Sequence, residues 1–555
     1  MGSSLPHFLS RFHGGLKLPG NKAESTSTPI MRADLPEQLI LPVQQHIGET
    51  GEILVKAGDT VLKGQPLTWV KTHISAPIHA PTSGTIKDIC KHPVPHPSAL
   101  NSLCIILESD GKDEWMELNA VENFRQLSTA EILEHIRQAG IVGLGGAAFP
   151  AAVKLDHGPD KEIETLIING AECEPCISCD DMLMREHADE IVSGIEIILH
   201  ALNARQCVIA VENNKPEAIK NLNHALEQSS LANIRLITVP TIYPSGGEKQ
   251  LIKIITGKEV PNDGLPADIG LIMQNVGTAT AIHRAIHLGQ PLISRIVTVT
   301  GKGIHQPQNM QALIGTPMNE LIEQSGGYTD QADRLIMGGP MMGFALGTDQ
   351  LPIIKGANCL LVETEGEHNE EPIMPCIRCG ECARVCPANL LPQQLYWHAS
   401  SKNFDQIQDY HLFDCIECGC CAYVCPSHIP LVQYYRFAKT EIWNQERERI
   451  KSDHARIRHD FRQDRLAREK QEREERLRKK KELLAKKKQA EKNNNKTPVE
   501  NSSEKSAIEA ALARVNAKKE NADTSKKNTT NLTANQQQQI EEADRRRQID
   551  KTEQT

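Results

Sequence analysis

Two copies of one cysteine pattern lie close together late in the chain. Each copy reads C-x2-C-x2-C-x3-C-P, and the copies span residues 376–387 and 415–426. This spacing is typical of the ligands of a cubane iron-sulfur cluster, and in two-cluster proteins the fourth cysteine of each copy binds the other cluster. The sequence therefore predicts two [4Fe-4S] clusters with crossed ligands: Cys376, Cys379, Cys382 and Cys425 for one, and Cys415, Cys418, Cys421 and Cys386 for the other.

The spacing of these cysteines suits a cubane, because thiols at every third position of a tight loop can reach three of its corners while the proline turns the chain away. Structural zinc is a weaker alternative, since zinc sites usually show two separated C-x2-C pairs. Disulfides are weaker still, since nothing in the sequence indicates an oxidising compartment. Cys420 lies between ligands and is interpreted as non-ligating. The pattern indicates a protein that transfers electrons.

Helices are predicted to position the cluster ligands. The apolar residues between the two copies recur at approximately helical spacing. They are Leu390, Leu391, Leu395, Tyr396, Phe404, Ile407 and Tyr410.

A further group of thiols, Cys173, Cys176 and Cys179, repeats the same spacing without a fourth Cys-Pro. Cys207 or Cys359 could complete a site in three dimensions. Buried free thiols are common, so a third metal site and ordinary core thiols both stay open.

A glycine-rich segment, residues 143–150, could bind a phosphate or a flat ring, because backbone N–H groups approach closely where no Cβ intervenes. Lys154 would add a positive charge for a phosphate. The loop alone is a weak signal, but two segments strengthen it. Residues 166–175 form an apolar strand that ends in polar residues, and residues 243–250 form a turn before a helical run. Ligands of α/β sheets bind beyond the carboxyl ends of strands, where such residues converge.

Residues 49–89 alternate short β-rich stretches with turn signals. The segment resembles the barrel-sandwich fold of lipoyl and biotinyl carriers. Its hairpin region holds Lys71 and His73 without the residues that flank a carrier lysine, so a structural module is favoured over a carrier role.

The chain of 555 residues is long enough for three or four domains, and no apolar run approaches the roughly 18 residues of a membrane helix. The start also lacks the apolar stretch of a signal peptide, so a soluble or peripheral protein in the cytoplasm is predicted.

Charge separates the tail from the rest of the chain. Residues 441–555 carry 30 Lys and Arg against 22 Asp and Glu, whereas the preceding residues carry 32 against 49. The tail is predicted to begin as a solvated helix and then to be disordered. Its lysines could contact anionic lipid or an acidic partner, or only keep the chain in solution. Nucleic acid is not expected, because no binding motif accompanies the charge.

Five motifs in order resemble the RnfC family of the Rnf electron transport complexes, also called RsxC. They are the glycine loop, residues 169–175, 243–250 and 274–278, and the paired cluster motifs. The resemblance spans roughly residues 10 to 440, and the middle domain of this family is related to the NADH-binding flavoprotein of respiratory complex I. It implies a multidomain α/β and α+β fold: an N-terminal segment (1–30), a barrel-sandwich domain (31–125), a Rossmann-type FMN/NADH domain (126–290), a β-grasp ligand-binding-like module (291–360), a helical two-cluster ferredoxin domain (366–440) and the tail (441–555).

The resemblance also implies site residues. Non-covalent FMN would be held by Gly143, Gly145, Gly146 and Lys154, with further contacts from Asn169 and Asn275. Four more residues would lie near the flavin and the nicotinamide nucleotide: Glu172, Glu174, Tyr243 and Glu248. The family loop commonly reads G-G-A-G-F-P-T, whereas Ala148 and Ala151 here replace the last glycine and the threonine. A methyl group at 148 could crowd the flavin, and the missing hydroxyl removes one possible hydrogen bond.

The function that the resemblance implies is NADH-dependent electron transfer through FMN and the two clusters, with no general acid or base. The partners would be membrane-embedded and membrane-anchored subunits of one ion-translocating complex, with ferredoxin or a redox-sensing regulator as further candidates. The protein would lie on the cytoplasmic face of a bacterial inner membrane. Two alternatives are an iron-sulfur relay and docking protein without flavin, and a scaffold with a degenerate nucleotide site.

Overall fold

A computed structural model describes the chain in two compact units, Met1–Arg447 and Glu448–Thr555. Lys71 and His73 of the barrel-sandwich hairpin lie outside the described residues, and so does most of the tail after residue 494. The structure describes residues 9–494, except 71, 73, 98–99, 159–160, 230, 263 and 368–370. It also describes the single residues 510 and 513.

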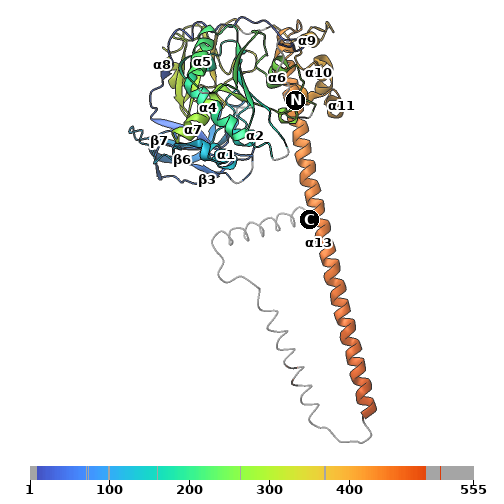
Figure 1. Ribbon diagram of the computed structural model, residues 1–555. Coiled ribbons are helices and arrows are strands. Elements are labelled where there is room, and N and C mark those ends of the chain that lie inside the picture. The colour runs from blue at the N-terminus through green and yellow to red at the C-terminus, as the bar shows by residue number, and fades with distance from the viewer. Residues whose placement is uncertain are drawn as a thin grey trace. The chain divides into compact units, whose positions relative to one another are not determined.

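The segment that resembles a barrel-sandwich fold forms two small antiparallel sheets (Figure 1). One sheet has the order β2 (Gln38–Pro42), β7 (Asn101–Ser109), β6 (Gly84–Pro93) and β4 (Thr60–Val61), and the other pairs β3 (Glu52–Ile53) with β5 (Thr68–Trp69). The core of the segment contains fully buried apolar residues of β2, β6 and β7, among them Leu39, Ile86, Ile105 and Leu107.

The middle of the first unit holds a four-stranded parallel sheet. Its order is β10 (Ile234–Val239), β9 (Gln206–Glu212), β8 (Thr165–Gly170) and β11 (Leu271–Asn275). The chain runs outward from β8 to β10 and then returns to the other side of β8 with β11. The strand order therefore reverses between β8 and β11, and such a switch point is where α/β sheets bind ligands.

Helices cover both faces of this sheet, as the continuous apolar run of β8 requires. Leu166 and Ile168 pack into one core, while Ile167 packs into a second core with residues of α6. Ser128 and Glu131 form a capping box that starts α1. The elements are η1 (Phe124–Gln126), α1 (Thr129–Gln138), α2 (Ala151–Leu155), α3 (Cys179–Glu186), α4 (Ala188–Leu202), α5 (Pro216–Gln228), α6 (Glu248–Thr256), η2 (Pro266–Ile269) and α7 (Val276–His287).

A six-stranded mixed sheet follows, with α8 (Met318–Gln324) as its helix. Its edge strand β1 comes from the start of the region assigned to the barrel-sandwich domain and pairs in parallel with β13. The order is β1 (Met31–Arg32), β13 (Gln308–Leu313), β12 (Ser294–Thr300), β16 (Cys359–Thr364), β14 (Ala332–Met337) and β15 (Phe344–Ala345).

The cysteine region is helical, as its apolar spacing predicted. Leu395 and Ile407 are fully buried in its core, whereas Leu391 stays exposed before α10. The helices are α9 (Glu381–Arg384), α10 (Pro392–Ser400), α11 (Phe404–Asp409), η3 (Leu412–Asp414), α12 (Cys420–Tyr423) and the long α13 (Leu431–Asn494).

The second unit is helical from its start to Asn494, and the side chains of residues 461–490 are exposed throughout. This agrees with the predicted solvated, charged helix. None of the helices that the structure describes combines the length and the apolar character of a membrane span.

Candidate functional site

The eight cysteines of the paired motif line two separate cavities. Each cavity has three thiols from one copy and the fourth thiol of the other copy, so the structure brings together both predicted ligand sets. Cys420 also lines the second cavity and is fully buried. The first cavity holds Cys376, Cys379, Cys382 and Cys425, and the second holds Cys386, Cys415, Cys418 and Cys421. Four thiols around each cavity are the donor set that a [4Fe-4S] cluster needs.

The two cysteine loops have the same backbone conformation. Arg378 and Glu417 occupy equivalent positions before the second cysteine of each copy, with φ of 59° and 57°. Gly380 and Gly419 follow that cysteine with φ of 82° and 80°. Left-handed residues tighten each loop, and glycine accepts this conformation at little cost. The equal spacing of the two motifs therefore produces two equivalent ligand loops.

The glycine loop lies at the switch point of the parallel sheet. Asn169 at the end of β8 pairs in register with Asn275 at the end of β11. A Cβ on Gly145 would lie 3.4 Å from Cβ of Asn275. The Asn275 side chain caps α7 through its Oδ1, which accepts from the N–H of Gly277 at 2.8 Å. The Asn169 amide donates to the carbonyl of Gly246 at 2.8 Å, which ties the 243–250 turn to the same place.

The backbone of Leu144 fixes the glycine loop from two sides. Its N–H donates to Oγ1 of Thr278 at 3.0 Å, and its carbonyl accepts from both terminal nitrogens of Arg295 at 3.2 Å. Gly146 has a φ of 123°, and a Cβ built on it would meet nothing within 4 Å. The loop therefore has an open side that fits a flat ring, as an FMN site requires.

Ala148 adopts the left-handed conformation, with a φ of 51°. Glycine adopts this conformation at little cost, which explains why the family loop commonly has glycine at the position of Ala148. The Ala148 methyl lies 3.8 Å from the point that a Cβ on Gly356 would occupy, so it packs against the next module. Ala151 is buried as the first residue of α2.

Lys154 and Glu248 form an ion pair with 2.7 Å between Nζ and Oε1. Their side chains keep 31% and 38% of their accessible surface. Both residues were predicted to lie near the flavin or the nucleotide, and the structure brings them together where a solute can reach them.

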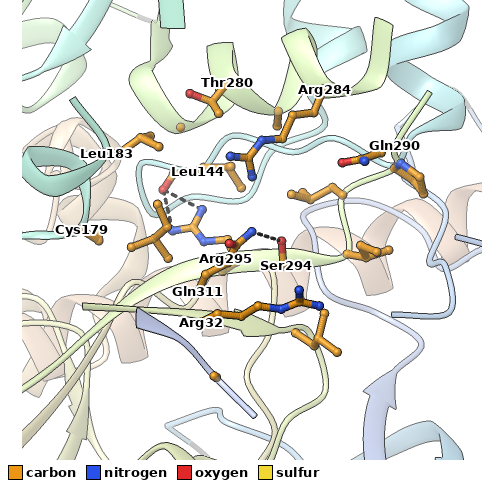
Figure 2. Close-up of a pocket in the computed structure, with 18 of the residues that line it drawn as sticks. Arg32, Leu144, Cys179, Leu183, Thr280, Arg284, Gln290, Ser294, Arg295 and Gln311 are labelled. Carbon is orange, nitrogen blue, oxygen red and sulfur yellow. Dashed lines mark hydrogen bonds between the residues drawn. The ribbon is translucent and has the colours of Figure 1, made fainter. Parts of the chain in front are cut away.

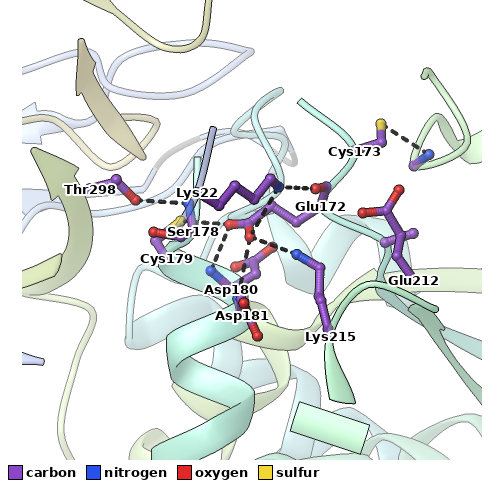
Figure 3. A network of polar contacts seen from close by, with 12 residues as sticks. Lys22, Glu172, Cys173, Ser178, Cys179, Asp180, Asp181, Glu212, Lys215 and Thr298 are labelled. Carbon is purple, nitrogen blue, oxygen red and sulfur yellow. Dashed lines mark hydrogen bonds and ion pairs between the residues drawn. The ribbon is translucent and has the colours of Figure 1, made fainter. Parts of the chain in front are cut away.

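Glu172 lies in a buried ionic network instead of at an open nucleotide site (Figure 3). Its carboxylate is 3.1 Å from Nζ of Lys215 and 3.7 Å from Nζ of Lys22, and it accepts from the N–H of Asp180 at 2.8 Å. Burial alone would raise the pKa of Glu172, but the two lysines hold it below its usual value. Burial and the neighbouring Glu172 raise the pKa of Asp180 to about 6. The sequence reasoning missed both lysines, which lie far from Glu172 along the chain.

Glu174 and Tyr243 connect the flavin domain to two other modules. The half-buried Glu174 carboxylate accepts from the N–H groups of Met341 and Met342 at 2.8 and 3.0 Å, and desolvation raises its pKa. The Tyr243 hydroxyl donates to the carbonyl of Cys418 at 2.5 Å. Tyr243 therefore joins the flavin domain to one of the cysteine loops, and Glu174 joins it to the turn between β14 and β15.

The N-terminal segment reinforces that junction. Leu16 and Tyr243 exchange two backbone hydrogen bonds of 2.7 and 2.8 Å. The N–H of Gly15 donates to the carbonyl of Val385 at 3.0 Å, and the carbonyl of Cys386 lies 2.9 Å from Nδ1 of His13. No sequence signal was assigned to this segment, although its two consecutive glycines at 14 and 15 offered one.

The additional thiols separate in the structure. Cys176, Cys179 and Cys359 share one small hydrophobic cluster, whereas Cys207 lies in the main core. Cys173 accepts from the N–H of Gly246 at 3.2 Å. Burial raises the pKa of Cys176 to about 11. Among the described residues, the one compact group of three metal-type donor atoms is formed by Glu172, Cys179 and Asp180.

Four family models match consecutive parts of the chain. They are the RnfC barrel sandwich hybrid domain at residues 10–112, the Nuo51 FMN-binding domain at 136–284, the SLBB domain at 296–345 and the 4Fe-4S dicluster domain at 375–429. These matches confirm the predicted multidomain fold with its FMN and iron-sulfur cofactors. A flavin domain and a dicluster domain in one chain define an electron-transfer protein of the oxidoreductase class.

The chain belongs to the RnfC family of ion-translocating oxidoreductase complexes. A relative of this family from Vibrio cholerae serotype O1 is 50% identical over 92% of this chain and 64% of its own length. The relative from Pectobacterium atrosepticum is 47% identical over 91% of this chain and 70% of its own length. The relative from Yersinia pestis is 49% identical over 83% of this chain and 74% of its own length. The chain thus spans somewhat less than two thirds of the Vibrio relative.

Proposed function

We propose that this chain passes electrons between NADH and two [4Fe-4S] clusters by way of FMN bound at the glycine loop. The contact that carries this proposal is the hydrogen bond from Tyr243 to the carbonyl of Cys418. Tyr243 begins the turn whose Gly246 is bonded to Asn169 at the switch point. One continuous set of contacts therefore leads from the flavin loop to a cluster ligand.

The chain's own residues divide into those that hold the flavin and those that support the site. The flavin would be faced by Gly143, Gly145 and Gly146 and contacted by Asn169 and Asn275. Lys154 would neutralise its phosphate. Bound FMN would take a hydride from NADH and release its electrons singly, which is the form that the clusters accept.

Glu248 is the acidic residue that remains accessible for the nucleotide. It is 38% exposed in its pair with Lys154, whereas Glu172 lies in a buried ionic network and Glu174 already accepts from two backbone N–H groups. We therefore assign Glu248 to orienting the nicotinamide nucleotide, and Glu172 and Glu174 to holding the backbone around the site. Positioning of this kind accelerates a transfer without acid or base chemistry.

The cluster held by Cys386, Cys415, Cys418 and Cys421 would be the one next to the flavin, and the cluster held by Cys376, Cys379, Cys382 and Cys425 the more distant one. His13 and Tyr243 both contact backbone carbonyls of the nearer ligand set. We therefore assign the ligand set of Cys386, Cys415, Cys418 and Cys421 as the one that would hold the cluster accepting electrons from the flavin domain.

The proposal extends to the complex. Ion translocation would be performed by membrane-embedded subunits, and this chain would lie on the cytoplasmic face as a peripheral, NADH-dependent member of a translocase. Ferredoxin or a redox-sensing regulator would exchange electrons with the complex, and the lysine-rich helix α13 could contact anionic lipid. The domain limits given from the sequence belong to this proposal as well.

The proposal is tested on the full chain, purified with its clusters. A flavin absorption band that NADH bleaches, followed by cluster reduction, is expected. Lys154→Met should lower FMN retention, and Glu248→Gln should lower the rate of NADH-driven reduction. Each effect should be at least about tenfold, which corresponds to the loss of one charge-assisted contact. Lys161→Met is the matched control, because Lys161 pairs with Asp268 at the same 2.7 Å and has similar exposure. Intact clusters without flavin, unresponsive to NADH, would instead support the relay alternative.

A further inference from the structure

A cavity of about 250 Å³ lies on the side of the glycine loop that Arg295 contacts (Figure 2). It is formed where three modules meet. The barrel-sandwich domain contributes Lys63 and Trp115, the flavin domain contributes Leu144, and the six-stranded sheet contributes Arg295. None of the described residues that we assign to flavin or cluster binding lines it.

The walls of the cavity are rich in positive charge. Four cationic side chains line it: Arg32, Lys63, Arg284 and Arg295. Figure 2 shows the guanidinium groups of three of them around the same space.

Two carboxylates outside the lining form ion pairs with three of these cations. Asp113 lies 3.1 Å from Arg32 and 2.6 Å from Lys63. Glu190 lies 2.6 Å from Arg284.

Arg295 is the cation without such a partner. It is buried, and its described hydrogen bonds go to the backbone carbonyls of Leu144 and Ala357. No carboxylate of the described residues forms an ion pair with it. The single carboxylate in the lining is Asp180, whose pKa burial raises to about 6, so it is largely ionised at neutral pH. Asp113, Glu190 and Asp180 together leave one positive charge of the four cations uncompensated. A buried arginine that forms no ion pair favours an anionic ligand beside it.

The remaining lining is largely apolar. Leucine, isoleucine, proline and alanine side chains and one indole surround the charged groups, and Ser294 and Gln311 add polar atoms. Apolar cavities of about 150 Å³ accept a benzene ring, so this volume has room for a fused ring system. Pockets with an apolar body and few polar groups are typical of small-molecule sites.

We propose that this cavity binds a small organic monoanion with a flat apolar body, such as an aromatic carboxylate. The carboxylate lies among the guanidinium groups of Arg32, Arg284 and Arg295, and the apolar body packs against Trp115 and Leu144.

Occupation of the cavity is coupled to the flavin loop, a part of the proposal that rests on the proposed function. Leu144 contributes its side chain to the cavity and its backbone to the loop. Asp180 lines the cavity and accepts from Nδ2 of Asn275 at 2.6 Å, and Asn275 is a proposed flavin contact. Coupling of two sites is reciprocal. If a ligand in the cavity changes the affinity of the chain for FMN, bound FMN changes the affinity for that ligand by the same factor.

Calorimetry with 2-naphthoate and its neutral analogue 2-naphthamide tests the site on the full, flavin-free chain. The naphthoate should bind once per chain, and the amide should bind at least about tenfold more weakly. Ala281→Phe fills the cavity and should abolish binding, whereas Ala281→Ser should keep it. Arg32 is 76% exposed, so Arg32→Gln should leave the fold intact and weaken naphthoate about threefold, with Arg32→Lys as the control.

Equal affinity of the two probes, or naphthoate binding that Ala281→Phe leaves unchanged, would overturn the site. If Ala281→Phe does not fold, the proposed site is tested by comparing 2-naphthoate with 2-naphthamide and by the effect of Arg32→Gln on naphthoate affinity. The coupling is measured by repeating the naphthoate titration with FMN bound, and a shift of at least about threefold is expected. An affinity that FMN does not change would overturn the coupling alone. A chain that binds no FMN refutes the proposed function, and the flavin-free titration is independent of that result.

Discussion

Lys355 joins the three modules that meet beneath the glycine loop, and its replacement gives the sharpest test of how they are held. Its side chain is 1% exposed. Its Nζ donates to the carbonyls of Pro77 at 2.8 Å and Gly140 at 2.7 Å, one in the barrel-sandwich domain and one beside the flavin loop. Burial lowers the pKa of Lys355 from 10.5 to about 7. The buried charge therefore costs stability wherever Lys355 is protonated in the folded chain.

The sign of the pH dependence follows from this lowered pKa. Below pH 7 both folded and unfolded chains carry the proton, so the full penalty is present. Between pH 7 and 10.5 the folded chain loses the proton first, and stability rises with pH. At 1.36 kcal/mol per pKa unit, the gain from pH 7 to pH 9 is about 2 kcal/mol. His46 and His79, with pKa values of about 4 and about 3, are neutral over this range and add nothing.

Lys355→Met should remove that gain. Thermal unfolding of wild type and variant at pH 7, 8 and 9 is compared, so that the titration of the thiols cancels. The wild type should gain about 2 °C relative to the variant across the range, since a cooperative unit of over 400 residues shifts by roughly 1 °C per kcal/mol. Lys63→Met is the control, because Lys63 is buried beside Asp113 and its loss should leave the slope unchanged. A constant difference between wild type and Lys355→Met would refute the reasoning.

Three further outcomes are expected at the cofactor sites. Cys386→Ala combined with Cys420→Ala should lower the iron content from about eight to about four atoms per chain and remove one reduced-cluster EPR signal, because Cys420 lines the same cavity as a potential substitute ligand. Tyr243→Phe should weaken the flavin-cluster junction by about 1 kcal/mol and slow NADH-driven cluster reduction at unchanged flavin content, as stopped-flow absorbance would show. Ala148→Gly should change FMN affinity less than about twofold in a fluorescence titration, because its methyl packs away from the open side of the loop. A tenfold gain in affinity would show that the methyl crowds the flavin.

The sequence was most informative where chemistry and local spacing coincide. A C-x2-C-x2-C-x3-C-P run needs its cysteines within one tight loop, so the spacing alone predicts the ligand type and the helical surroundings. The glycine loop, the end of β8 and the end of β11 were likewise predictable as a group, because a parallel sheet brings the carboxyl ends of neighbouring strands together.

The roles of individual acidic residues were less predictable. The family resemblance implied that Glu172 and Glu174 lie near the nucleotide, yet Glu172 is in a buried ionic network and Glu174 accepts from the backbone of another module. The two lysines beside Glu172, at positions 22 and 215, come from opposite sides of it along the chain. A carboxylate next to a strand end can serve a ligand or a tertiary ion pair, and composition does not separate these outcomes.

The N-terminal segment shows how a local signal becomes interpretable only with its partner. Gly14 and Gly15 both have positive φ, 69° and 82°, and a Cβ on Gly14 would lie 2.5 Å from the carbonyl oxygen of Val385. Only glycine therefore allows the backbone to pass this close to the residue before Cys386. Since the same segment pairs with Tyr243, two adjacent glycines set how the cysteine loops approach the flavin domain. The electron path that we propose depends on this close backbone approach as well as on the ligands.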